Sequence, residues 1–193
     1  MAADDAVDCW HETFQFSLQA KGGTAYEMNG ITEDISGFDF GVKDIEGVAL
    51  ANGGRVAKWT PQADESMTIK AWPTDVLMGT KGFWQHFHPL STADTTGTAE
   101  VPNTRTRLRV QGIIRWSTNP PATAGTAGTA NAREYLVVIK NAYVTNVKPG
   151  LEDKNMSAEI TLKWPPFDTS GTANMTHYSS DGSAALGAVT TYS

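Results

Sequence analysis

Residues 41–72 read GVKDIEGVALANGGRVAKWTPQADESMTIKAW, and this stretch decides the expected fold. At its centre, Asn52-Gly53-Gly54 supplies the positive φ angles that tight hairpin turns require. After a second turn that contains Pro61, residues 66–72 alternate between polar and apolar side chains, which is typical of a half-buried strand. The stretch therefore predicts a long hairpin at 41–65 followed by a strand of a sheet.

The hairpin is polar and rich in glycine, which makes it poor material for the core of a monomer. We expect it to act as an arm that lies against the sheet of a neighbouring subunit. The alternative is a long exposed hairpin without a partner.

The rest of the chain adds further strands and one helix. Segments with strand patterns are residues 11–18, 105–116, 134–147 and 156–164. Aromatic and aliphatic residues at roughly helical spacing predict a single helix at 75–88. Because no strand–helix–strand repeat is present, we expect a mainly β fold, an antiparallel β-sandwich or barrel with one flanking α-helix and long loops.

The predicted domain covers residues 1–168, with Pro165-Pro166 ending its last strand and Lys148-Pro149-Gly150 turning the chain before that strand. Two polar surface loops are expected, at residues 91–104 and 117–132. The second loop is low in complexity and should be mobile. Residues 169–193 form a Ser/Thr/Gly/Ala-rich C-terminal segment, which is either a loosely held tail or a segment ordered by contacts.

Charge is distributed unevenly along the chain. The net charge is −6, yet residues 1–46 hold ten acidic side chains against Lys21 and Lys43, a net of −8 that leaves +2 for the remainder. Strand 105–116 carries four arginines on one face. An ion-paired subunit interface is favoured there over a nucleic-acid stripe, because no aromatic residues alternate with the arginines on that face and the chain is acidic overall. The alternative is that the acidic residues in the first part of the chain serve solubility alone.

No catalytic or metal-binding constellation is expected. His86-Phe87-His88, together with His11 and His177, could hold a metal only if the segment is extended, since residues two apart on a helix do not share a face. Cys9 lies near the N-terminus without an implied base. We therefore expect no enzyme activity, no metal and no cofactor.

Tryptophans offer the main alternative function. Five of them, which lie in or next to apolar patterns, are Trp59, Trp72, Trp84, Trp116 and Trp164. An exposed set would suit a carbohydrate- or ligand-binding β-sandwich module, whereas core packing is the expected role.

The N-terminal residues lack the basic and apolar regions of a signal peptide, and no apolar run is long enough to span a bilayer. We expect synthesis in the cytoplasm, a chain that stays soluble unless it assembles, and no membrane partner.

Three features, in order along the chain, resemble tail tube proteins of tailed bacterial or archaeal viruses. The first is the extended, Gly-rich segment from Asp39 to Val56 with the strand Met67–Trp72, and the second is the single central helix. The third is the late pair of segments 140–145 and 157–163, closed by residues 165–168.

The resemblance implies hexameric rings that stack head-to-tail into a hollow tube, with 41–65 as the loop between rings and 75–88 as the flanking helix. Its implied partners are further copies of the chain, a tape-measure protein and viral DNA in the lumen, and tail terminator and tail-tip or baseplate proteins at the ends. The implied location is the virion tail, and the implied role is genome delivery.

We further expect acidic residues of 33–46 to meet the arginine face across subunit contacts. The predicted interface residues are Glu33, Asp34, Asp39, Asp44, Glu46, Asn52, Gly53, Gly54, Arg55, Arg105, Arg107, Arg109 and Arg115.

Overall fold

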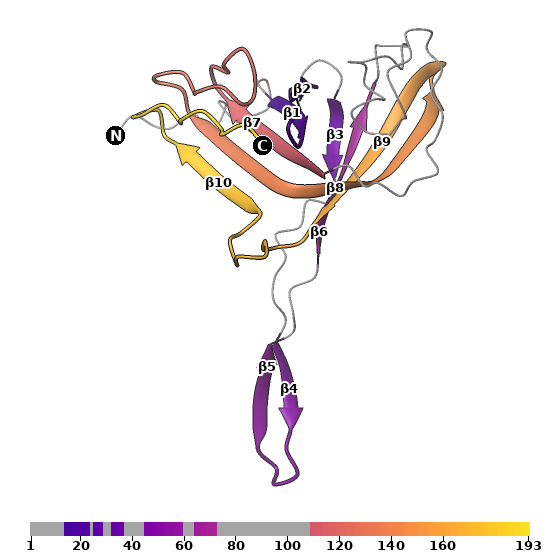
Figure 1. Cartoon of the computed structure of the whole chain (residues 1–193), viewed down its shortest axis with the longest axis vertical. Helices are drawn as coiled ribbons and strands as arrows, with labels where there is room; N and C mark the ends of the chain where they lie inside the picture. Colours follow the sequence, from indigo (N-terminus) through magenta and orange to yellow (C-terminus); the bar gives the residue numbers. More distant parts are fainter. Residues whose placement is uncertain (1–13, 24, 29–31, 37–44, 60–63, 73–108) are drawn as a thin grey trace.

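A computed structural model describes residues 14–23, 25–28, 32–36, 45–59, 64–72 and 109–193. All regular structure in these ranges is β, and every strand pair is antiparallel, which confirms the predicted mainly β class (Figure 1). The predicted helix at 75–88 and loop at 91–104 lie outside the described residues. The strands are β1 (Phe14–Ala20), β2 (Ala25–Glu27), β3 (Thr32–Ser36), β4 (Ile45–Ala49), β5 (Arg55–Trp59), β6 (Glu65–Ala71), β7 (Arg109–Ser117), β8 (Glu134–Glu152), β9 (Asn155–Trp164) and β10 (Met175–Ser180).

Strand β8 organises the main sheet, whose order is β2-β1-β7-β8-β9-β6-β3, with β10 also paired to β8. The first part of β8, up to Tyr143, pairs with β7, and β10 pairs with its beginning. From Tyr143 onward β8 pairs with β9. The sheet therefore has a first half (β2, β1, β7, the start of β8, and β10) and a second half (the end of β8, β9, β6 and β3).

Irregular pairing marks the point where β8 passes from one half-sheet to the other. Its register with β7 shifts opposite Val110–Gly112, and Asn141 there has a φ of 56°. A second shift lies between Val144 and Asn146 in the pairing with β9. Each shift leaves one extra residue on β8, and such bulges bend a strand and increase its twist. This is how a strand turns the corner between two sheets that pack across each other.

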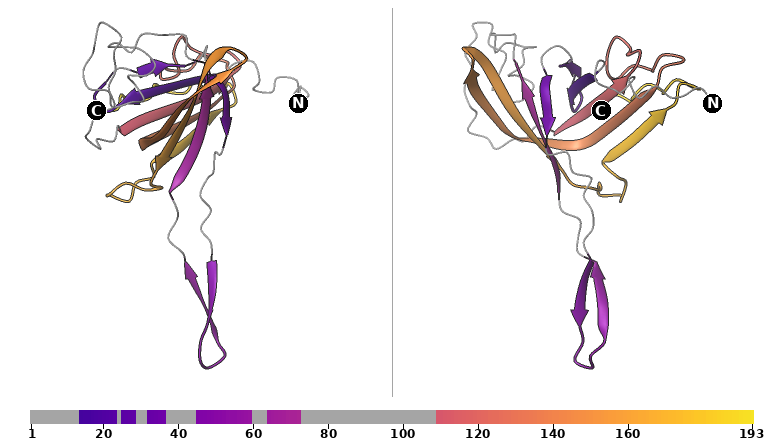
Figure 2. Two further views of the ribbon diagram at one scale, coloured as in Figure 1. Left: turned by 90° about the vertical axis from the view of Figure 1, so that its right-hand side faces the viewer. Right: turned by 180° about the vertical axis from the view of Figure 1, so that it is seen from behind.

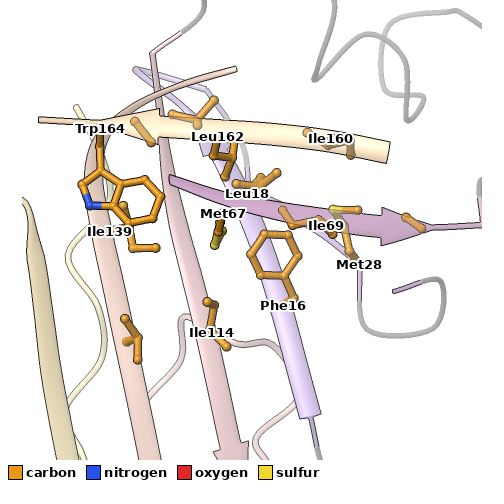
Figure 3. Close-up of a cluster of buried hydrophobic side chains, with 14 of the residues drawn as sticks. Phe16, Leu18, Met28, Met67, Ile69, Ile114, Ile139, Ile160, Leu162 and Trp164 are labelled. Atoms are coloured by element: carbon orange, nitrogen blue, oxygen red, sulfur yellow. The ribbon is translucent and has the colours of Figure 1, made fainter. Parts of the chain in front are cut away.

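The core fills the space between the two half-sheets, where strands β6 and β9 cross over β1, β7 and β8 (Figure 3). Its largest members, all almost fully buried, are Phe16, Leu18, Met28, Met67, Ile69, Ile114, Ile139, Ile160, Leu162 and Trp164. The alternation expected for β6 and β9 is confirmed, because Met67, Ile69 and Ala71 are buried and so are residues 158, 160, 162 and 164. The period of two thus places one face of each strand in the core.

The opposite face of the first half-sheet is covered as well, by residues 118–132 and by the end of the chain. Ala124 is fully buried and packs with Ile113, Leu136 and Val138 in a second apolar cluster. The segment 117–132, expected to be a mobile surface loop, thus packs on the sheet through Ala124. Low complexity predicts loops because such segments have few large apolar groups, but small alanines fit closely against a sheet.

One expected chain reversal lies elsewhere. Lys148-Pro149-Gly150 does not turn the chain, because these residues continue β8 and pair with β9. Proline is tolerated there since β7 no longer pairs with this part of β8. The turn is at Asp153 and Lys154, whose φ angles of 48° and 66° are those of a tight hairpin.

The chain also does not leave the fold at Pro165-Pro166. Strand β10 follows and pairs with the beginning of β8, along the same edge with which β9 pairs further on. Of the two alternatives for residues 169–193, a loosely held tail or a segment ordered by contacts, the pairing of β10 with β8 supports the second. Tyr192 near its end is buried, and its backbone N–H donates to Oε1 of Gln19 over 3.1 Å.

Strands β4 and β5 form a separate two-stranded sheet that stands clear of the main sheet in views at right angles (Figures 1 and 2). Its turn is at the predicted position. Gly53 has a φ of 82°, and the Leu50 N–H donates to the Gly54 carbonyl over 2.7 Å.

Candidate assembly surfaces

The projecting hairpin presents apolar side chains to solvent. Val48 and Val56 are directly opposite each other in the β4–β5 register and are 42% and 49% exposed. Leu50 beside the turn is 44% exposed. A two-stranded hairpin is marginally stable on its own in water. Burial of these three side chains against another surface would therefore stabilise the hairpin as well as the contact.

The predicted hairpin residues have turn and surface roles. Asn52 accepts through Oδ1 from the backbone N–H of Gly54 over 3.0 Å, which fixes the turn. Gly53 supplies the positive φ, and Arg55 begins β5 on an exposed stretch. Glu46 lies on β4, opposite Lys58 in the register. The turn chemistry was readable from the sequence, whereas the exposure of the apolar pair was not.

The four arginines predicted for the interface differ in location. Arg105 and Arg107 lie outside the described residues. Arg109 is exposed at the start of β7, where Nη2 and Nε donate to the Tyr143 hydroxyl over 2.8 and 3.2 Å. Its guanidinium also stands 5.4 Å from the centre of the Tyr143 ring. The hydrogen bond with Tyr143 raises the pKa of Arg109. The two hydrogen bonds and the ring contact hold this charge in position at the surface.

Arg115 is a correction to the predicted interface. Its side chain is fully buried, with Nη1 3.4 Å from Oε1 of Glu134 and Nη2 donating to the Thr126 carbonyl over 2.7 Å. Burial lowers the pKa of Arg115. The charge faces the layer made by residues 118–132 and does not reach a free surface. Alternation placed it on the face of Arg109, but the covering of that face is a tertiary feature.

The described acidic residues lie in a different part of the sheet from the described arginines. Glu33 and Asp34 lie on β3, where Asp34 pairs with Lys70 in the backbone register. Strand β3 ends the second half-sheet, while β7 lies in the first. Asp39 and Asp44 are outside the described residues.

A further exposed feature is the tip of the β8–β9 hairpin, which no sequence prediction included. Leu151 is 80% exposed, and Met156, its direct partner in the register, is 39% exposed. Glu152 at the same tip forms a 2.6 Å ion pair with Lys70. The only signal in the sequence was a leucine beside Glu152-Asp153-Lys154, which is an isolated apolar residue in a polar segment.

Two of the tryptophans considered for a ligand-binding surface pack in or against the core. Trp164 is fully buried in the core, and its Nε1–H donates to Oε2 of buried Glu65 over 2.5 Å. Trp116 is partly buried against the same core. Trp84 lies outside the described residues.

Residues proposed for metal binding or chemistry do not come together in the part of the chain that the structure describes. Within it, no group of three histidine, cysteine or acidic side chains could hold a metal ion. His177 is on β10, and its Nδ1 lies 2.6 Å from the Tyr135 hydroxyl. His11, His86, His88 and Cys9 lie outside. The same described ranges contain no helix able to cross a membrane.

No protein-family model matches the chain, and no curated protein matches its sequence. Among solved structures, it is similar to a chain of the sheath–tube complex of an extracellular contractile injection system in its extended state. The identity is 11% over 93% of this chain and 100% of that chain, with a TM-score of 0.49. A chain of the sheath/tube terminator of such a system shows 14% identity over 87% and 94%, also with a TM-score of 0.49.

The tube-terminating cap of the anti-feeding prophage shows 11% identity over 86% of this chain and 88% of that chain, with a TM-score of 0.47. The Hcp1 protein of E. coli EAEC 042 is 12% identical over 86% and 97%, with a TM-score of 0.37. These four similarities are distant, at 11–14% identity and with TM-scores below 0.5.

Proposed function

We propose that the chain is a structural, non-enzymatic subunit that assembles head-to-tail into rings and then into a hollow tube of the viral tail type. The observation that carries the proposal is the β4–β5 hairpin, which stands away from the sheet with Val48 and Val56 exposed. Such an arm gains stability when a neighbouring copy covers it. A contact between an arm and a different surface of the next copy is heterologous, and it builds rings and open stacks.

Sheet edges support the same proposal. In the described part of the chain, β10 pairs only with β8, and β3 pairs only with β6, so each leaves one edge open. Open edges invite pairing with another strand, and closure into a barrel removes them. Rings of six subunits would close the edges in this way. The lumen would then hold a tape-measure protein and conduct DNA, with terminator and tip proteins closing the ends.

The proposed location is the tail of a virion, after synthesis in the host cytoplasm. An acidic chain suits a conduit for DNA, because contacts between cationic side chains and phosphates supply most non-specific affinity.

The test is a concentration series of purified protein, followed by light scattering and negative-stain electron microscopy. We expect rings or hollow tubes above a threshold concentration. The double variant Val48→Asp/Val56→Asp should abolish them while leaving the thermal unfolding of the main sheet unchanged. Thr169→Asp, which adds charge at an exposed loop position, is the matched control and should assemble normally.

Assembly of the double variant at the wild-type threshold would contradict a role for the hairpin. A wild-type protein that stays monomeric at every concentration and salt, and that binds a glycan in a screen, would instead favour a ligand-binding module.

A further inference from the structure

The face of the first half-sheet that lies away from the main core contains a pocket of about 150 Å³. Strand β8 supplies Leu136 and Val138 to its lining, β10 supplies Tyr178, and the C-terminal segment supplies Leu186 and Val189. The side chain of Lys140, which is exposed, also lines it. The pocket lining thus combines aliphatic side chains with polar groups in about equal measure, and Lys140 is its one cation.

The tip of the β8–β9 hairpin has the complementary character. Leu151 protrudes with Met156 beside it, and Asp153 and Lys154 form the turn. The ion pair between Glu152 and Lys70 ties this end of the hairpin to β6 and limits its freedom. A leucine side chain fits the pocket by volume, since a cavity of about 150 Å³ is sufficient for a benzene molecule.

The tip and the pocket cannot meet within one chain. They lie toward opposite ends of the bent strand β8, and Figures 1 and 2 show the β8–β9 hairpin and β10 far apart, at the two ends of the curved sheet. The distance along the strand from Lys140 to Leu151 is roughly 35 Å at the usual rise per residue. Each copy therefore carries one apolar projection and one pocket with aliphatic side chains in its lining, which is the arrangement of a heterologous contact.

We propose that Leu151 of one copy inserts into this pocket of the next copy, with Asp153 of the tip facing Lys140 at the margin. The occupant is a second copy of the chain because both complementary surfaces belong to the chain itself. This contact rests on the proposed function, and it is separate from the contact of the β4–β5 hairpin. It gives the subunit a second fixed point, which would set the orientation between neighbours.

The first experiment compares the assembly thresholds of wild type and Leu151→Asp by sedimentation. Because burial of a leucine is lost and a charge is added, the threshold should rise at least tenfold. Leu151 is exposed in the monomer, so thermal unfolding of the monomer should not change. Thr169→Asp is again the control. An unchanged threshold for Leu151→Asp would overturn the contact while leaving the tube proposal intact.

The second experiment identifies the partner surface. Lys140→Glu should raise the threshold, and Lys140→Glu/Asp153→Lys should restore it, because the charges are exchanged. In a Cys9→Ser background that still assembles, Leu151→Cys/Tyr178→Cys should give a ladder of linked subunits with a short bis-maleimide, while each single cysteine should not.

Assembled particles without a ladder, or a charge exchange that fails to restore assembly, would count against the pocket as the docking site. A wild-type chain that does not associate at all would remove both the tube function and this contact, so the two failures are distinguishable.

Discussion

Arg115 and Glu134 face each other across β7 and β8, fully buried, with 3.4 Å between Nη1 and Oε1. Ser117 donates to the same carboxylate oxygen over 3.1 Å. Glu134→Leu would remove the carboxylate paired with this buried charge and leave only the attraction of Glu27. Breaking a buried ion pair typically costs about 3–5 kcal/mol of the free energy of unfolding. Urea denaturation should show this loss.

The double variant Arg115→Met/Glu134→Leu is the informative companion. Replacement of a buried ion pair by apolar side chains is often neutral. We therefore expect the double variant to regain most of the stability that Glu134→Leu loses. Equal destabilisation in both variants would show that the pair contributes through geometry that apolar side chains cannot replace.

Gly128 should be the glycine of the covering layer that tolerates no side chain. A Cβ at this position would overlap the carboxylate of Glu134, which cannot withdraw because it is buried under the layer. Gly128→Ala should therefore cost about 1–3 kcal/mol in urea denaturation, the usual range for overpacking. Gly187→Ala, where no atom lies within 4 Å of the added Cβ, should remain near wild type. Similar losses at both positions would argue against this close approach.

His177 should make stability depend on pH. Burial lowers its pKa below the ordinary 6.5, so the unfolded chain binds the proton more readily than the folded chain. The stabilising contribution is fully present above about pH 6.5 and is lost as the pH falls toward the lowered value. His177→Gln removes this dependence.

The measurement is the difference in urea midpoint between wild type and His177→Gln at about pH 7.5 and about pH 5. The other three histidines are present in both proteins, so their titration cancels in the comparison. We expect wild type to lose more stability than the variant on acidification. Parallel losses would show that His177 does not titrate differently in the folded state.

Arginine reversal tests the ionic part of the interface. Arg107→Glu/Arg109→Glu should block polymerisation in sedimentation without unfolding the monomer, because like charges would then face the acidic group of the neighbouring copy. Arg109→Lys is the milder comparison, since it keeps the charge but loses the paired hydrogen bonds to Tyr143. Tubes that form normally from the double variant would contradict the proposed ion pairs.

The sequence alone determined the local elements with short-range causes. Alternation identified β6 and β9 and the face of each that is buried, because the pleat sends successive side chains to opposite sides. Asn52-Gly53-Gly54 located the hairpin turn, because few residues adopt a positive φ. These signals operate over a few residues, so they do not depend on what packs against them.

Only the tertiary structure decided which faces are covered. Arg109 and Arg115 share one face of β7 by alternation, yet Arg109 is exposed and Arg115 is buried, because residues 118–132 and the C-terminal segment cover only part of that face. The bend of β8, which sends its end into the second half-sheet and leaves Leu151 exposed, also depends on partners distant in the sequence. The sequence thus specified β6, β9 and the hairpin turn, while long-range packing decided which charge pairs inside and which apolar residue remains at the surface.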